Sequence, residues 1–325
     1  MTQPHSGLHA PEIKGPKILA GSASPKLAAA IAKELGLPLA ASEVLIFSEG
    51  NTFVRVRENV RGHDVFVIQG IANPVNDNFV ELLFWIDALK RASAAEVTAV
   101  IPFFSYAKGD KKDEPRVSIR ARVCADALEA AGVDRVLTMD LHSAQIQGFF
   151  RRPVDHLYAL PVICDYVRER KIPDLTVASA DVGFGKQAAK YADALGAPVI
   201  IGNKERTDHS ENARVWSVIG DPKGRNILIV DDIVFTGGSI VSLAAALKEA
   251  GARDIYAAIT HGVLTKGSAA KLAQSPIKEL IVTDSVERPF EAPPANLCVI
   301  SVAPLFAQAI RSIYERTSIS RLFPS

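Results

Sequence analysis

The chain has 325 residues, of which 48% are hydrophobic and 22% are charged, a composition typical of a soluble globular protein with room for two domains of about 150 residues each. Its formal net charge of +1 provides no overall positive field for nucleic acid, and no run of about 18 apolar residues suits a transmembrane helix, so neither nucleic acid nor a membrane is an expected partner. The 3 cysteines lie far apart in sequence, which argues against a disulfide framework or a zinc site and fits a reducing cytoplasm.

The first half of the chain alternates short apolar runs with helical patterns after a polar tail. Residues 1–14 lack a continuous apolar segment, so we expect a loose tail and no signal peptide. Ser24 and Pro25 form a good helix start, and Gly36 and Gly132 each end a helical pattern. Strands are predicted at 17–20, 44–47, 52–57, 64–69, 97–104 and 135–139, and helices at 25–35, from after 78 to about 91, and at 121–131.

Polar side chains follow two of these predicted strands. Strands that alternate with helices imply a mainly parallel sheet, and ligands bind beyond the carboxyl ends of its strands. A charged loop with Lys108 and Lys111 follows one strand and could hold nucleotide phosphates or simply be exposed. His142 follows the next strand and could bind a divalent metal, act as a general base or be structural. The sequence therefore favours a site near these two strand ends.

The second half repeats the alternation of strands and helices. Asp181 lies at a predicted strand end, where it could share a magnesium ion. Lys204 and Arg206 lie in a predicted polar loop, which could close over a polyphosphate or be a solvated charge cluster. His261 follows another strand and could be structural or a metal ligand. Strands are predicted at 175–178, 198–201, 214–219, 227–230, 255–260, 280–283 and 297–301, and the last helix at 303–313.

A buried strand, two carboxylates and a glycine-containing loop follow one another in the second half. The aliphatic run at 227–230 predicts a buried parallel strand, and Asp231 and Asp232 come directly after it. In the following segment, Thr236-Gly237-Gly238-Ser239, Ser239 can cap a helix that begins near Ile240. Such a loop suits a phosphate, and paired carboxylates suit adjacent hydroxyls or a metal. A sugar phosphate carries both groups, whereas the alternative is an ordinary turn with a solvated aspartate pair.

This stretch resembles the phosphoribosyl diphosphate loop of type I phosphoribosyltransferases and of ribose-phosphate diphosphokinase. Further segments resemble the second family, and the resemblance runs from about Lys17 to the C-terminus. The segment 140–150 is highly specific, because a type I transferase shares only the Asp-Asp loop. The segments that carry the resemblance are 59–62, 76–78, 87–93, 140–150 and 231–239.

The resemblance implies a fold and an activity. The implied fold is α/β, with two type I phosphoribosyltransferase-like domains, each a mainly parallel sheet flanked by helices. The domains would comprise residues 15–157 and 158–302, and the C-terminal helix within 303–325 would pack back on the first domain. The implied reaction transfers the diphosphoryl group of ATP to O1 of ribose 5-phosphate, giving 5-phosphoribosyl 1-diphosphate and AMP, with Mg²⁺ as cofactor. The family also forms homo-oligomers built from dimers, commonly hexamers.

The same resemblance assigns roles to individual residues. The paired aspartates would bind the ribose hydroxyls and the glycine-containing loop the 5-phosphate, while a hairpin would reach the nucleotide of a neighbouring subunit. The implied residues are Lys204, Arg206 and His142 for catalysis; His142 and Asp181 for the metal; Asp231, Asp232, Thr236, Gly237, Gly238 and Ser239 for ribose 5-phosphate; and Phe47, Glu49, Lys108, Asp110 and Lys111 for the nucleotide.

Several positions depart from the family pattern, among them Lys108 where an arginine is common, and Pro115, Val117 and Ser118 in the usual phosphate-activated regulatory loop. Phe235 stands where an acidic residue is usual, Gly109 where a glutamine is common, and Asn51 where the hairpin usually has a second acid. A phenyl ring cannot hydrogen-bond a ribose hydroxyl. These departures keep two alternatives open beside the active enzyme. One is a non-catalytic homologue that regulates an active synthetase, and the other is a phosphoribosyltransferase or diphosphokinase that acts on another sugar phosphate.

Overall fold

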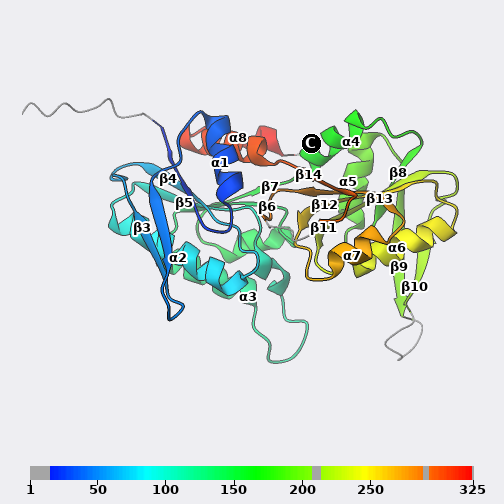
Figure 1. Ribbon diagram of the computed structural model, residues 1–325, viewed down its shortest axis with the longest axis horizontal. Helices are drawn as coiled ribbons and strands as arrows, with labels where there is room; N and C mark the ends of the chain where they lie inside the picture. The colour runs from blue at the N-terminus through cyan, green and yellow to red at the C-terminus, as the bar shows by residue number, and fades with distance from the viewer. Residues whose placement is uncertain (1–14, 207–213, 288–292, 324–325) are drawn as a thin grey trace, which may run out of the picture.

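The structure, a computed structural model, describes residues 15–206, 214–287 and 293–323. Within these ranges the chain forms two α/β halves that lie side by side, each with a sheet between layers of helices (Figure 1). Both sheets are mainly parallel, which confirms the predicted fold class. The tail predicted at residues 1–14 lies outside the described residues.

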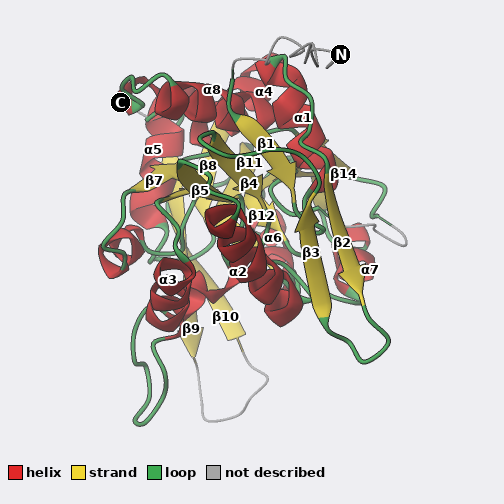
Figure 2. Ribbon diagram, turned by 90° about the vertical axis from the view of Figure 1, so that its left-hand side faces the viewer, coloured by secondary structure: helices red, strands yellow, loops and turns green. Residues whose placement is uncertain are grey.

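The N-terminal half contains a sheet of five strands in the order β1-β4-β5-β6-β7, and each neighbouring pair is parallel. A separate antiparallel hairpin, β2-β3, projects beyond the body of the protein (Figure 2). β5 ends at Ile101 and not at residue 104, because Pro102 lacks the N–H group that would continue the ladder. The elements are β1 (Lys17–Ala20), α1 (Pro25–Leu35), β2 (Ser42–Ile46), β3 (Thr52–Val56), β4 (Asp64–Ile68), α2 (Val75–Arg91), β5 (Glu96–Ile101), η1 (Ser105–Gly109), α3 (Arg120–Ala131), β6 (Arg135–Met139), η2 (Ala144–Phe149) and β7 (Val154–Leu157).

The C-terminal half contains a sheet of seven strands in the order β10-β9-β8-β11-β12-β13-β14. All neighbouring pairs are parallel except β9 and β10, which are antiparallel. The elements are α4 (Leu160–Glu169), β8 (Leu175–Ser179), α5 (Gly185–Leu195), β9 (Val199–Arg206), β10 (Arg214–Ile219), β11 (Asn226–Val234), α6 (Gly238–Glu249), β12 (Ile255–Gly262), α7 (Ser268–Ala273), β13 (Ile277–Thr283), β14 (Leu297–Ile300), α8 (Ala303–Tyr314) and η3 (Ser320–Leu322).

Two strands of this sheet continue through polar residues that were predicted to lie in loops. β11 includes Asp231 and Asp232, because β12 extends far enough to pair with it up to Val234 and Gly262. β9 continues through Lys204 to Arg206, because β10 turns back and pairs with it. A neighbouring strand supplies hydrogen-bond partners whatever the polarity of the side chains. The loops predicted after residues 201 and 230 therefore begin later.

One apolar layer runs across both halves. Leu27 of α1, Ile163 of α4, Ala188 of α5 and Phe306 of α8 are buried in the same hydrophobic cluster. Figure 1 shows these four helices on one side of the two sheets. α8 follows the last strand of the C-terminal half but packs against α1 of the N-terminal half. We propose that the halves divide between β7 and α4, at residues 157 and 158, while sharing this layer.

The carboxyl ends of the two sheets face each other. Ala72, Phe103, Val263 and Val286 follow β4, β5, β12 and β13, respectively, and together form a small buried cluster between the halves. Ligands bind beyond the carboxyl ends of parallel strands. The fold thus points the binding edges of both sheets at the same region.

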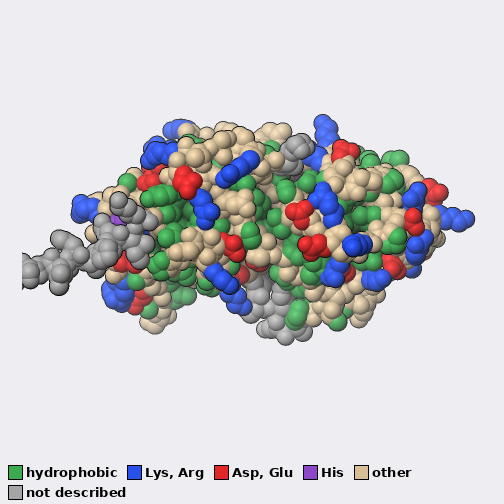
Figure 3. Space-filling view, turned by 90° about the horizontal axis from the view of Figure 1, so that it is seen from above, with side chains coloured by type: hydrophobic (Ala, Val, Ile, Leu, Met, Phe, Trp, Pro, Cys, Tyr) green, Lys and Arg blue, Asp and Glu red, His purple; other side chains and the backbone are tan. Residues whose placement is uncertain are grey.

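The outer surface carries charges of both signs. Seen from above in Figure 3, basic and acidic side chains are interspersed over the visible face. Among the described helices, none combines the length and the apolar character that crossing a membrane requires.

Candidate active site

A cavity of about 560 Å³ lies between the facing ends of the two sheets. In the N-terminal half, its lining residues come from η1 and the loop after it, and from the segment after β6. In the C-terminal half, they come from the segment after β8, from the end of β11 and from the residues that follow β11. β8 and β11 are neighbours in the sheet, so the segments at their ends lie close together. The predicted site residues that line this cavity are Lys108, Asp110, Lys111, His142, Asp181, Asp231, Asp232, Thr236, Gly237, Gly238 and Ser239.

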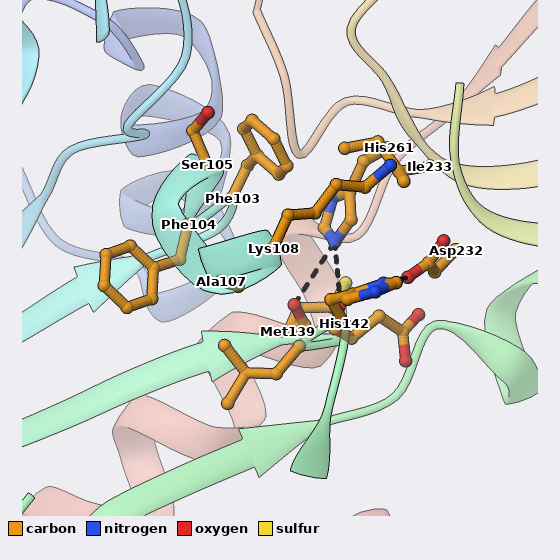
Figure 4. Close-up of a pocket in the computed structure, with 12 residues that line it drawn as sticks. Phe103, Phe104, Ser105, Ala107, Lys108, Met139, His142, Asp232, Ile233 and His261 are labelled. Atoms are coloured by element: carbon orange, nitrogen blue, oxygen red, sulfur yellow. Dashed lines mark hydrogen bonds and ion pairs between the residues drawn. The ribbon is translucent and has the colours of Figure 1, made fainter. Parts of the chain in front are cut away.

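His142 and Asp232 join the two halves at the cavity wall. The Nδ1 atom of His142 lies 2.9 Å from Oδ2 of Asp232, although 90 residues separate them in sequence. This hydrogen bond raises the pKa of His142. Burial opposes ionisation of Asp232, but the His142 hydrogen bond holds its pKa below the ordinary range. Figure 4 shows Lys108 and His142 of the N-terminal half beside Asp232 and His261 of the C-terminal half.

The neighbouring aspartate has a different electrostatic environment. Oδ1 of Asp231 accepts a hydrogen bond from the backbone N–H of Asp232 at 2.9 Å. Burial, followed by repulsion from the Asp232 carboxylate, raises the pKa of Asp231 well above its ordinary range. The two carboxyl groups are therefore unequal. Asp232 is the stronger acid of the pair, and Asp231 is the harder of the two to ionise.

The glycine-containing loop lines the cavity and leads into α6. Gly237 has a φ of +73°, which favours glycine, and a Cβ atom there would lie 3.2 Å from Cγ of Leu272 and crowd that side chain. α6 begins at Gly238 after the N-cap residue Gly237, which has no side chain, and the Gly238 N–H lies 3.4 Å from Oγ1 of Thr236. The prediction that Ser239 caps this helix is wrong, because the left-handed Gly237 starts the helix earlier and places Ser239 in its first turn. The first turn of this helix suits an anion.

Phe235 contacts a cation across the two halves. The ammonium nitrogen of Lys108 lies 4.4 Å from the centre of the Phe235 ring, within the range of a cation–π interaction. The ring also packs against the buried cluster of Phe103 and Val263. Sequence reasoning treated Phe235 only as a missing acid. In the folded chain it is an apolar wall of the cavity that keeps Lys108 beside the site.

Two of the predicted residues, Phe47 and Glu49, do not line this cavity, and two others, Lys204 and Arg206, cannot be placed against it. Phe47 and Glu49 lie at the tip of the β2-β3 hairpin, where the Phe47 ring contacts Phe53 with a centroid distance of 5.9 Å. Lys204 and Arg206 are in β9 and not in a loop, and their side chains lie outside what the structure describes.

A buried polar group supports the turn that carries His142. Oδ2 of Asp140 accepts hydrogen bonds from Thr260 Oγ1 at 2.6 Å and from the Ala159 N–H at 3.1 Å. Burial raises the pKa of Asp140 to about 6. Sequence reasoning missed Thr260 and also His156, which contacts the same turn. Thr260 lies in β12 and His156 in β7. Their contacts with the turn join segments that are separated in sequence, so the local sequence does not show them.

The donor set of the cavity suits a metal ion that is shared with a substrate. Within the described ranges, no three His, Cys, Asp or Glu side chains converge on one metal position. His142 and Asp181 nevertheless line the same cavity as the paired aspartates. Mg²⁺ usually keeps several waters and takes one or two carboxylates together with substrate phosphates. The residues present therefore fit a divalent cation that arrives with a polyphosphate.

Two parallel sheets that meet around an Asp-Asp strand end and a glycine-containing loop define a protein of the type I phosphoribosyltransferase-like class. Comparison with known families gives two matches: the N-terminal domain of ribose phosphate pyrophosphokinase over residues 16–132, and the phosphoribosyl synthetase-associated domain over residues 209–324. The chain belongs to the ribose-phosphate pyrophosphokinase family, whose members are enzymes that transfer diphosphate groups. The predicted family and enzyme class are confirmed.

Individual relatives support this assignment over nearly the whole chain. The ribose-phosphate pyrophosphokinase of Caldanaerobacter subterraneus subsp. tengcongensis is 48% identical, with 94% of this chain and 97% of the relative covered. The ribose-phosphate pyrophosphokinase of Clostridium tetani is 46% identical, with 96% of this chain and 98% of the relative covered. The crystal structure of phosphoribosylpyrophosphate synthetase from Mycobacterium smegmatis superposes with a TM-score of 0.88 at 41% identity, covering 93% of this chain and 100% of that chain.

Proposed function

We propose that the protein transfers the β,γ-diphosphoryl group of ATP to O1 of ribose 5-phosphate, giving 5-phosphoribosyl 1-diphosphate and AMP. The observation that carries this proposal is the single cavity lined by the Asp231–Asp232 pair and the glycine-containing loop on one side and by Lys108 and His142 on the other. One side suits a sugar phosphate and the other a polyphosphate. The family membership supports the same reaction.

The sugar subsite follows from the C-terminal half. Asp232 accepts hydrogen bonds from ribose hydroxyls, and a bound cation would favour the ionised form of Asp231. The N–H groups at the start of α6 and the hydroxyls of Thr236 and Ser239 bind the 5-phosphate. These contacts direct O1 toward the nucleotide side of the cavity.

The nucleotide subsite follows from the N-terminal half. Lys108 and Lys111 attract the phosphates, and Asp110 adds an acceptor at the same edge. We assign a divalent metal, Mg²⁺, to His142 and Asp181. When bound, the metal would neutralise charge on the diphosphate. Because Nδ1 of His142 is held by Asp232, its Nε2 remains available to the metal or the substrate.

In the reaction, the O1 hydroxyl attacks the β-phosphorus and loses its proton as the new O–P bond forms. The bond between the β-phosphorus and the oxygen that bridges to the α-phosphate breaks, and AMP leaves with that oxygen. Such transfer needs positioning and charge neutralisation more than covalent catalysis. We assign Lys204 and Arg206 to the neutralisation of developing charge, on the basis of their match to the family's catalytic loop.

The direct test is the formation of AMP from ATP and ribose 5-phosphate in the presence of Mg²⁺. AMP and 5-phosphoribosyl 1-diphosphate in equal amounts are the expected result. No AMP, with ribose 5-phosphate still bound in calorimetry, would contradict the proposal and favour a non-catalytic regulatory homologue. Diphosphate release from 5-phosphoribosyl 1-diphosphate only when a nucleobase is added would favour a transferase.

We also propose that the protein acts in the cytoplasm as a homo-oligomer based on dimers, in which one chain's hairpin completes its neighbour's nucleotide subsite. Exposed apolar side chains at the hairpin support this arrangement, since Ile46 is 75% and Phe47 47% exposed in the single chain. The hairpin lies away from its own chain's cavity, so Phe47 and Glu49 would act only on a second copy.

Mixing two inactive variants tests the shared site. A chain with Phe47→Ala and Glu49→Ala keeps its catalytic residues, and a Lys204→Ala chain keeps its hairpin. After co-refolding, about a quarter of the sites in a random mixture contain both intact parts and should regain activity. A mixture as inactive as its components would contradict the shared site.

A further inference from the structure

The turn that follows β6 carries His142 and has an unusual backbone. Asp140, its first residue, has a φ of +36°, in the left-handed region that non-glycine residues rarely adopt. Its N–H donates to the Leu157 carbonyl at 3.0 Å, which continues the parallel pairing of β6 with β7. Further contacts must hold the carbonyls and the next N–H group in place, because the turn itself is strained.

We propose that His156 and His261 are positioning residues, two neutral imidazoles in opposite tautomers that hold this turn so that His142 meets Asp232. This inference rests on the proposed function for its kinetic readout, whereas its tautomer readout is independent of any activity. Neither imidazole lines the 560 Å³ cavity. His261 lines the pocket of Figure 4 beside His142 and Asp232, and both imidazoles contact the backbone of the turn.

His261 holds the carbonyl groups of the turn from the C-terminal half. Its Nε2 atom lies 3.2 Å from the Met139 oxygen and 3.3 Å from the Asp140 oxygen. Carbonyls only accept hydrogen bonds, so Nε2 must carry the proton. Nδ1 lies 2.8 Å from Ser285 Oγ and accepts from that hydroxyl. Figure 4 shows the His261 ring above the Met139 carbonyl, with the two contacts drawn as dashed lines.

His156, which lies in the N-terminal half, holds a backbone N–H group of the turn and not a carbonyl group. The N–H of Leu141 donates to Nε2 of His156 at 2.8 Å. This nitrogen must therefore lack a proton, and the neutral ring carries its proton on Nδ1. Nδ1 lies 3.4 Å from the side-chain amide of Gln147, so this tautomer requires the amide to present its oxygen to the ring. His156 is 3% and His261 2% exposed. Burial lowers the pKa of each to about 4, so both rings are neutral at physiological pH.

These contacts fix the two consecutive peptide groups on either side of Asp140. One imidazole donates to carbonyls of residues 139 and 140, and the other accepts the N–H of residue 141. Thr260, directly before His261, binds the Asp140 side chain as well, so β12 holds both the backbone and the side chain of that residue. Loss of either imidazole frees the turn and moves His142 relative to Asp232, because the two side chains come from different halves.

The first test reads the tautomers directly. In metal-free protein labelled with ¹⁵N-histidine, chemical shifts at pH 7.5 should give Nε2–H for His261 and Nδ1–H for His156. His156→Gln and His261→Gln assign the two signals. A charged ring or the reverse tautomer at either position would overturn the proposal, and this result stands whether or not the protein forms AMP.

The second test separates positioning from packing. His156→Leu and His261→Leu should each lower kcat by about 10- to 100-fold, the usual effect of removing an outer-shell partner, with the KM for ribose 5-phosphate nearly unchanged. Glutamine at the same positions offers a hydrogen-bonding group near the place of Nε2 and should restore most of the kcat. Leu247→Ala, a buried change near the carboxyl end of α6, is the matched control.

Folded leucine variants with wild-type kcat would overturn the positioning role, as would glutamine variants no better than leucine. If the leucine variants do not fold, the glutamine variants and the tautomers decide the question. A wild-type protein that forms no AMP would refute the proposed function while leaving the tautomer result in place.

Discussion

The two aspartates at the end of β11 are neighbours in sequence, but their pKa values are shifted in opposite directions. Asp232 has a histidine partner from the other half, whereas Asp231 accepts a backbone N–H and has a like charge beside it. Two carboxyl groups with separated pKa values can play different roles in one site. Asp232 is therefore the residue that links the sugar subsite to His142.

Asp232→Asn should lower the pKa of His142 in the metal-free protein. The wild-type pKa lies above the ordinary value of about 6.5, chiefly because Asp232 accepts its hydrogen bond. An amide removes the negative charge, so the pKa should return toward that value. NMR titration of the His142 ring proton measures it. Asp231→Asn, which removes no His142 partner, is the control, and an unchanged pKa in Asp232→Asn would contradict the assignment.

Lys204→Ala should lower turnover by about three orders of magnitude or more if this side chain stabilises transition-state charge. The fold should be unaffected, as circular dichroism would show. Lys223→Ala, an exposed lysine in the loop before β11, is the control and should leave turnover unchanged. Equal rates for Lys204→Ala and the wild type would remove Lys204 from the catalytic residues.

At the scale of secondary-structure elements, α8 packs the end of the chain against its beginning. Its apolar face lies in the same cluster as α1, although the helix follows the last strand of the C-terminal half. At α6, the left-handed conformation of Gly237 sets the residue at which the helix begins. Each element is positioned by a small number of residues whose partners are distant in sequence.

Phe306→Ala should destabilise the protein by about 3–5 kcal/mol, because it leaves a cavity in the layer between α8 and α1. Phe306 is fully buried, whereas Gln308 on the same helix is exposed. Gln308→Ala should therefore change stability by less than about 0.5 kcal/mol. Urea denaturation compares the two variants. Similar midpoints would show that α8 does not contribute to this core.

At the scale of the whole molecule, the halves share a hydrophobic layer and a cavity. Leu27, Ile163 and Phe306 belong to one buried cluster, although they come from the beginning, the middle and the end of the chain. His142 and Asp232 meet only because the carboxyl ends of both sheets face each other. Stability and function should therefore depend on the two halves together.

The halves should unfold together and not one after the other. In hydrogen–deuterium exchange at increasing denaturant, peptides that cover β4 and β12 should lose protection at the same concentration, because their common layer is lost at once. Phe306→Ala should shift both midpoints equally. Two well-separated midpoints would show that each half is stable alone.

Local patterns allowed much of the architecture to be predicted. Short apolar runs that alternate with helical patterns indicated the α/β class, because a buried parallel strand leaves a local signal. Element ends were less predictable. β7, with Asp155 and His156 among its four residues, was not predicted, and β9 and β11 continue through charged residues. Their lengths depend on a neighbouring strand, which local sequence does not show.

The sequence by itself determined the family and the chemical groups available to the site. The Asp231–Asp232 pair and the loop 236–239 are contiguous, so their chemistry could be interpreted without a fold. Only the tertiary structure decided that His142 meets Asp232, that Phe235 contacts Lys108, and that His156 and His261 hold the β6 turn. These contacts join segments far apart in the chain, and the charges and tautomers of their side chains follow from burial and from partners that exist only after folding.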